Sequence, residues 1–157
     1  MKTDWQLAKL GALVTHQKGF AFKSTTYKTS GRPIVRVSDF TSRSVDMSKC
    51  SFIDDVLAAE FDQYRLKFRD VVIATVGSWP TNPESVVGKT VAVPYETENA
   101  LLNQNAVRLR GTDDLDQRFL FYLLNAPAFG AYIAHTAQGS ANQASITLKD
   151  IFAFEFA

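Results

Sequence analysis

The feature that most constrains the fold is a run of β-branched residues near the middle of the chain. Val71-Val72-Ile73-Ala74-Thr75-Val76 stops at Gly77, and it contains a single polar side chain. Apolar runs of this length without alternation are typical of strands buried on both faces. The run therefore predicts a buried strand.

Weaker patterns place other elements on both sides of this strand. Extended segments are expected at residues 34–38, 45–53, 86–93, 106–109 and 151–156. Helices are expected at residues 5–10 after Asp4, 54–64 from Asp54-Asp55, 113–124 from Asp113-Asp114, and 127–137 from Pro127. Polar stretches rich in glycine or proline predict loops at residues 19–31 and 77–83. The predicted class is α+β, a mixed sheet with several short helices.

The bulk properties indicate one domain. A chain of 157 residues fits a single core, and no repeat or linker divides it. Cys50 is the only cysteine, so no internal disulfide forms. No signal peptide and no apolar run long enough for a membrane span is present. We expect a cytoplasmic protein without membrane contact.

Charge is distributed unevenly along the chain. The net charge is +1, yet residues 1–43 hold eight Lys or Arg and two Asp. A basic N-terminal quarter permits a local anionic partner, although the whole chain is less basic than most nucleic-acid binders. Solvated surface lysines explain the same pattern equally well.

One motif suggests a phosphate-binding loop, but the residues around the motif exclude a P-loop. Val87-Gly88-Lys89-Thr90 matches the end of a P-loop, which requires an earlier glycine where this chain has Pro83. The following Val91-Ala92-Val93 predicts a strand, whereas the motif requires a helix.

Other catalytic patterns are also missing. His16 and His135 are far apart in sequence, Cys50 has no nearby partner, and no nucleophile elbow or dinucleotide turn occurs. The paired acids at residues 54–55 and 113–114 have a structural explanation as helix caps. We expect no enzyme activity, no metal and no cofactor.

Polar residues at the ends of the predicted elements suit duplex DNA. Amide side chains match the major-groove edge of adenine, arginine matches guanine, and lysine or hydroxyl groups hold phosphates. Each cluster also has a structural alternative: amides satisfy nearby backbone groups, Trp79 packs on the core, and Arg36 pairs with an acid. The candidate DNA-binding residues are Lys18, Lys23, Ser24, Thr25, Lys28, Arg36, Ser78, Trp79, Asn103, Gln104, Asn105, Ser140, Asn142 and Gln143.

The order of several short motifs gives a more specific indication. The series is Trp5 with Leu7-Ala8-Lys9-Leu10-Gly11, Gly19 with a polar loop to Tyr27, Gly31-Arg32-Pro33-Ile34-Val35-Arg36-Val37-Ser38-Asp39, Asp70-Val71-Val72-Ile73-Ala74 with Gly77, Val87-Gly88-Lys89, Leu102-Asn103-Gln104, Phe119-Leu120-Phe121-Tyr122-Leu123-Leu124, and Gly139-Ser140 with Gln143 and Ile146. This series resembles the target recognition domain of type I restriction-modification specificity subunits, over nearly the whole chain.

The resemblance implies a single α+β recognition domain over residues 1–157, with a strongly bent mixed sheet. It implies non-catalytic, sequence-specific reading of half of a bipartite target, with duplex DNA and the methylation and restriction subunits as partners. The alternative is a protein-interaction module that docks on a methyltransferase or restriction subunit.

The chain also departs from the family pattern. A glycine often precedes the aspartate of the strand motif, where this chain has Arg69. We expect neither the C-terminal spacer helix nor a second recognition domain in these residues, which end at Ala157.

Overall fold

The computed structural model of the protein describes residues 4–79, 87–140 and 142–157. The strands are β1 Ala8–Lys9, β2 Val14–Lys18, β3 Arg32–Val35, β4 Ser51–Ile53, β5 Val71–Ala74, β6 Val76–Gly77, β7 Thr90–Ala92, β8 Leu101–Leu102, β9 Ala106–Gly111, β10 Gln138–Gly139, β11 Ala144–Ser145 and β12 Glu155–Phe156. The α-helices are α1 Asp55–Ala58, α2 Gln117–Asn125, α3 Pro127–Thr136 and α4 Leu148–Phe152. Short 3₁₀ turns are η1 Leu10–Ala12, η2 Ser24–Thr26, η3 Val37–Asp39, η4 Ala59–Tyr64 and η5 Tyr95–Thr97.

The predicted buried strand is β5, inside an antiparallel sheet of order β2-β9-β5-β7. All four of its residues are buried, and alternate side chains enter different cores. Val71 and Ile73 join the core formed with α2, α3 and α4, whereas Val72 and Ala74 join a second core on the other face. Two covered faces explain why the run is apolar throughout.

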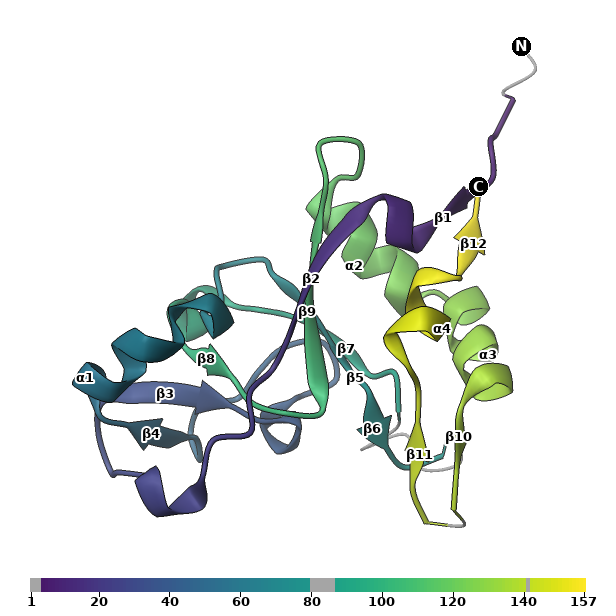
Figure 1. The fold of residues 1–157 in the computed structure, drawn as a ribbon. Helices are drawn as coiled ribbons and strands as arrows, with labels where there is room; N and C mark the ends of the chain where they lie inside the picture. The colour runs from purple at the N-terminus through teal and green to yellow at the C-terminus, as the bar shows by residue number, and fades with distance from the viewer. Residues whose placement is uncertain (1–3, 80–86, 141) are drawn as a thin grey trace.

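Smaller sheets extend the fold on either side of the central one (Figure 1). A three-stranded sheet of order β4-β3-β8 pairs β3 parallel to β8 and antiparallel to β4. The helices α2, α3 and α4 lie on the opposite side, above a second three-stranded sheet of order β10-β11-β6. The α+β architecture is confirmed, and in the described residues its strands are divided among several small sheets.

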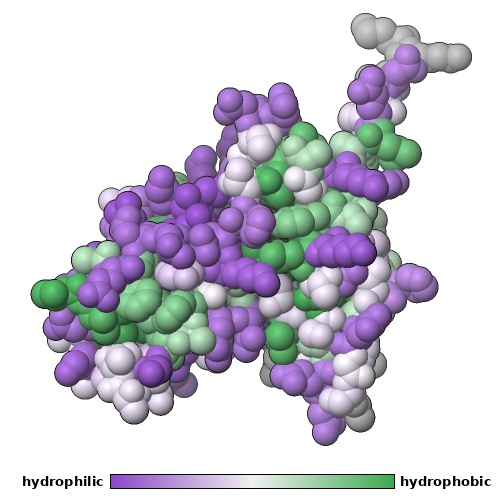
Figure 2. All heavy atoms as spheres, in the orientation of Figure 1, coloured by the Kyte–Doolittle hydropathy of each residue, from purple (hydrophilic) through white to green (hydrophobic). Residues whose placement is uncertain are grey.

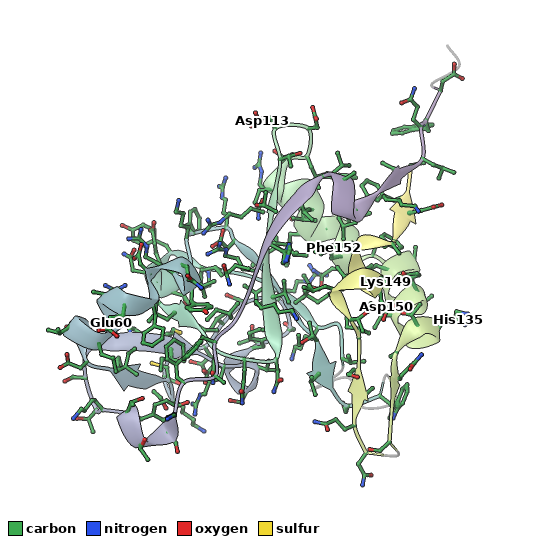
Figure 3. All side chains as sticks on the ribbon, in the orientation of Figure 1. Glu60, Asp113, His135, Lys149, Asp150 and Phe152 are labelled. Atoms are coloured by element: carbon green, nitrogen blue, oxygen red, sulfur yellow. The ribbon has the colours of Figure 1, made fainter. Side chains whose placement is uncertain are left out.

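Several predicted boundaries are wrong. Residues 5–10 form no α-helix, since β1 pairs there with β12. The predicted last strand, residues 151–156, begins inside helix α4, whose N-cap Thr147 accepts a hydrogen bond from the Asp150 amide, and only Glu155 and Phe156 form a strand, β12. The helix after the central sheet begins at Gln117 with Asp116 as its cap, so Asp113 remains in the preceding loop (Figure 3). The predicted cap Asp54 and the predicted start at Pro127 are confirmed.

Candidate nucleic-acid interface

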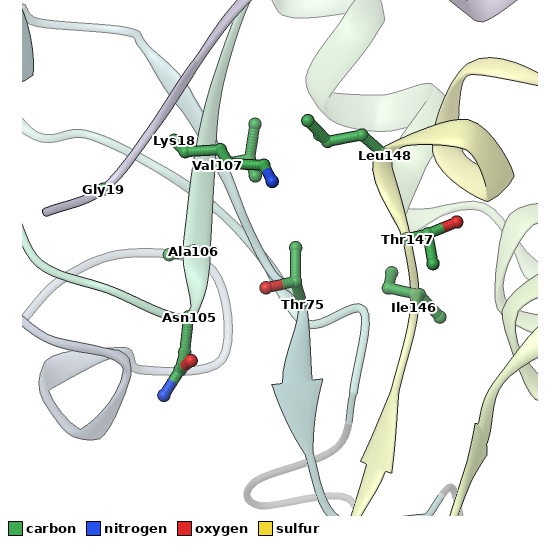
Figure 4. A pocket seen from close by; sticks show the side chains of 9 residues that line it. All are labelled: Lys18, Gly19, Thr75, Asn105, Ala106, Val107, Ile146, Thr147 and Leu148. Carbon is green, nitrogen blue, oxygen red and sulfur yellow. The ribbon is translucent and has the colours of Figure 1, made fainter. Parts of the chain in front are cut away.

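A cleft of about 350 Å³ opens between the central sheet and the segment that joins β11 to α4. We call it the central cleft; its polar side chains are Lys18, Thr75, Asn105 and Thr147. Lys18 enters from β2 on one side and Leu148 from the other side, with the lysine amine directed into the cleft (Figure 4). Lys18 is fixed there because it is the last residue of β2 and pairs with Val107.

The turn between β8 and β9 forms one edge of the central cleft. Gln104 and Asn105 are exposed, and Asn105 has a φ of 65°, a left-handed conformation that asparagine tolerates. Asn103, by contrast, is 8% exposed; its backbone N–H donates to the Val35 carbonyl at 2.9 Å, and its side-chain Oδ1 is buried without a hydrogen-bond partner among the described residues. The structure therefore places Asn103 inside the fold, away from the exposed Gln104 and Asn105.

Close packing beside this turn explains Gly19. The Gly19 amide donates to the Ala106 carbonyl at 3.0 Å. A Cβ atom at Gly19 would lie 1.7 Å from the Asn103 carbonyl oxygen, so any larger residue would push the chain away. The glycine thus keeps the end of β2 against the turn between β8 and β9, residues 103–105, which we call the amide turn.

A second polar group lies at the tip of the β10–β11 hairpin. Ser140, Asn142 and Gln143 are exposed there. The indole Nε1 of Trp79 donates to the Ser140 carbonyl at 2.7 Å, and the ring packs against the main core. Trp79 therefore supports the hairpin tip instead of projecting from it, while Ser78 is half-buried beside it. The rest of the predicted loop, residues 80–83, lies outside the described residues.

Thr75 joins these two groups, and sequence reasoning missed it. Its amide donates to the Asn105 carbonyl at 2.9 Å, and its carbonyl accepts from the Ile146 amide at 2.9 Å. The backbone of Thr75 thus fixes the amide turn relative to the hairpin, while its side chain lines the central cleft. The available signal was its hydroxyl, the single polar side chain in the buried run.

A third group surrounds η2, at the lower left of Figure 1. Lys23, Ser24, Thr25 and Lys28 are all exposed. The turn is held locally, because the Lys23 carbonyl accepts from both the amide and the hydroxyl of Thr26. In Figure 1 this group reaches the lower left of the molecule and the hairpin tip the lower right, and the turn between β8 and β9 lies higher between them, where the space-filling view in Figure 2 shows a notch.

Arg36 does not join this edge. Its guanidinium contacts the buried carboxylate of Asp39, with Nε 3.4 Å from Oδ2, and donates to the Lys49 carbonyl at 2.9 Å. The same carboxylate accepts from the Arg36 amide at 2.9 Å. The structure thus gives Arg36 the alternative role, pairing with an acid, and we omit it from the interface.

Comparison with known proteins identifies the family. The family model for the type I restriction modification DNA specificity domain matches residues 2–156. The chain belongs to the type I restriction-modification DNA specificity domain family. The chain is 25% identical over 145 residues to a putative type I restriction enzyme MjaX specificity subunit from Methanocaldococcus jannaschii, in a match that covers 91% of this chain and 33% of that protein.

Solved structures show the same fold for this specificity domain. An HsdS subunit from Thermoanaerobacter tengcongensis matches 99% of the chain with a TM-score of 0.66 and 19% identity, over 33% of its own length. A type I restriction-modification S subunit from M. genitalium matches 98% with a TM-score of 0.62 and 18% identity, over 34% of its length. The specificity domain therefore spans about a third of the length of these relatives.

The described residues of the specificity domain hold no cluster of His, Cys, Asp and Glu suited to a metal ion. His135 points outward at the end of α3, and His16 contacts the Phe152 ring (Figure 3). Thr90 is buried in β7, and its hydroxyl donates to the Gly88 carbonyl at 3.0 Å. This agrees with the predicted strand, where a P-loop would require a helix. Pro83 lies outside the described residues. Within the described ranges, no helix combines the length and apolar character that membrane crossing requires.

Proposed function

We propose that this domain reads one half of a bipartite duplex DNA target, without catalysing a reaction itself. The observation that carries the proposal is that three exposed polar groups lie along the lower side of the molecule in Figure 1: the η2 lysines, the amide turn and the hairpin tip. Family membership supports it, because the family is described as a DNA specificity domain and the relative from Methanocaldococcus jannaschii is named a type I restriction enzyme specificity subunit. Methylation and restriction subunits of the same system would then supply the chemistry.

The side chains divide into two roles. Lys18, Lys23 and Lys28, with the hydroxyls of Ser24 and Thr25, contact phosphates and fix the register of the domain on DNA. Gln104, Asn105, Asn142 and Gln143 carry planar amides that each offer a donor and an acceptor, as adenine recognition in the major groove requires. These four amides are exposed on turns, and the backbone of Thr75 fixes the two turns relative to each other.

Selection from a randomised duplex library at low salt tests the proposal. A single half-site gives weak binding that falls steeply with salt, so low ionic strength is needed to recover an enriched sequence. If no sequence is enriched, and if binding equals that of an acidic polymer, sequence-specific reading by this domain is rejected.

Two single substitutions separate the proposed roles. Lys23→Ala removes a phosphate contact and weakens binding by the same factor on selected and random duplexes. Gln104→Ala reduces the preference at one base pair, by roughly 1–3 kcal/mol of discrimination. Equal effects of Gln104→Ala on both duplexes would remove Gln104 from the base-reading set.

A further inference from the structure

A second concave surface lies at the other end of the central sheet. It is a groove of about 300 Å³, and we call it the arginine groove. Its lining includes three arginines, Arg43, Arg69 and Arg118, and three aromatic residues, Phe68, Phe121 and Tyr122. The register of the central sheet shows that the groove and the central cleft lie at opposite ends of β5. Val71 pairs with Leu109 and Ala92 at the end beside the groove, whereas Ala74 pairs with Ala106 beside the central cleft.

Aromatic rings are exposed around this groove. Tyr122 is 64% exposed and Phe68 is 45% exposed. Helix geometry brings three lining residues together, because Arg118, Phe121 and Tyr122 are three and four positions apart on α2. Large rings left in contact with water on one face mark interaction surfaces more often than scattered single residues do.

Arg69 has an unusual backbone. Its φ is 71°, in the left-handed region that favours glycine. The conformation is imposed from both sides, since its amide donates to the Val93 carbonyl at 2.9 Å and its carbonyl accepts from the Gln117 side chain at 3.1 Å. Glycine would satisfy this backbone, yet the position carries a guanidinium 5.1 Å from the centre of the Phe68 ring.

The positive charge of the groove is not neutralised by the ion pairs found among the described residues. None of those pairs includes Arg43, Arg69 or Arg118. Asp116 is the acid that interacts electrostatically with Arg69 and Arg118, and its carboxylate already accepts the Arg118 and Phe119 amides at the start of α2. The groove therefore combines cationic and apolar residues in its lining.

We propose that the arginine groove binds an acidic peptide segment of a partner protein, with one bulky apolar side chain against its apolar residues and carboxylates against the guanidinium groups. Arginine and tyrosine are enriched at the anchor points of protein interfaces, where they combine charge with apolar area. Duplex DNA fits less well, because its interfaces are more polar than protein–protein interfaces, whereas the lining of this groove includes Phe68, Val93 and Phe121. Its place at the far end of the sheet leaves the central cleft free for DNA.

The test uses the whole domain and a fluorescent peptide that has one phenylalanine flanked by aspartates and glutamates. A matched peptide replaces phenylalanine with glycine, and a third replaces the acids with lysine. Fluorescence anisotropy at low salt should show binding of the first peptide, weaker binding of the second and none of the third. Absence of binding, or equal binding of the first two peptides, overturns the proposal.

Protein variants locate the site. The double substitution Arg69→Gly with Arg118→Gln should weaken peptide binding by about tenfold or more, because it removes two charge-assisted interactions with the peptide. Arg69→Gly keeps a residue that accepts the left-handed backbone, so the fold is preserved. Lys23→Ala, at the other end of the molecule, should leave peptide binding unchanged, and the double variant should leave DNA binding unchanged.

These two readouts separate this proposal from the DNA-reading proposal, since either can fail while the other succeeds. Peptide binding that survives the double substitution contradicts the assignment to the groove. A single-stranded thymine oligonucleotide that binds the wild type more tightly than the peptide, and does not bind the double variant, would also overturn it in favour of a nucleic-acid ligand.

Discussion

Asp70 is a buried carboxylate that joins the start of β5 to β9. Its two oxygens accept from Nε and Nη2 of Arg110 at 2.6 and 2.8 Å, and one also accepts from the Lys67 amide at 2.7 Å. The hydrogen bond to Asp70 raises the pKa of Arg110, whereas burial lowers the pKa of the neighbouring Arg108. The ion pair between Asp70 and Arg110 is therefore lost when the Asp70 carboxylate is removed.

Asp70→Asn should destabilise the domain by roughly 2–3 kcal/mol, below the full penalty for a buried pair because Arg110 remains partly exposed. Urea unfolding measures the change. Glu155→Gln, which removes the exposed ion pair between Glu155 and Lys9 at 4.0 Å, is the matched control and should change stability by less than about 0.5 kcal/mol. Equal effects of the two substitutions would show that the Asp70 pair contributes little.

At the scale of the elements, the start of α2 shows which of several neighbouring aspartates caps the helix. The sequence offers Asp113, Asp114 and Asp116 before the helix, and the structure uses Asp116, which accepts the Arg118 and Phe119 amides at 2.9 and 3.0 Å. Asp116→Ala should lower the urea midpoint, whereas Asp113→Ala should not. A lower midpoint for Asp113→Ala alone would contradict this cap assignment.

The same cap predicts a dependence on pH. Hydrogen bonding to the Phe119 amide, with a smaller contribution from the Arg118 amide, lowers the pKa of Asp116 in the folded protein. A group with a lowered pKa contributes its full stabilisation above its unfolded value, about 3.9, and loses it as the pH falls through the folded value. The difference between wild type and Asp116→Ala should therefore be constant near neutral pH and shrink below about pH 4. A difference that persists at lower pH would exclude the carboxylate as its source.

Elements with strong local signals were predictable from the sequence. The apolar run of β5, the cap at Asp54 and the proline at the start of α3 are all decided by nearby residues. Positions decided by distant contacts were not predictable: Asn103 is buried because β3 and Phe20 pair with its backbone, whereas the pairing of Arg36 with Asp39, three residues away, was one of two alternatives that the sequence left open. The role of Thr75 depends on two partners, Asn105 and Ile146, that lie far along the chain.

At the scale of the whole molecule, the proposed DNA binding depends on local charge more than on net charge. The chain carries a net charge of only +1, so long-range attraction to DNA is weak. The proposed phosphate-binding lysines are local, however: Lys23 and Lys28 are exposed around η2, and Lys18 lines the central cleft. The proposed DNA binding would therefore rest on a small number of phosphate contacts.

This view gives a quantitative expectation for the salt dependence of binding. Each phosphate that a lysine neutralises contributes a slope of about −0.9 in a plot of log affinity against log salt concentration, so Lys18, Lys23 and Lys28 together should give a slope near −3. Each Lys→Ala substitution should make the slope less steep by about 0.9, and Arg69→Gly, in the arginine groove, should leave it unchanged. Fluorescence titrations of the selected duplex over a range of salt concentrations measure these slopes. A slope that stays the same after all three lysines are replaced would place the phosphate contacts elsewhere on the molecule, and an altered slope in Arg69→Gly would indicate that DNA reaches the other end of the sheet.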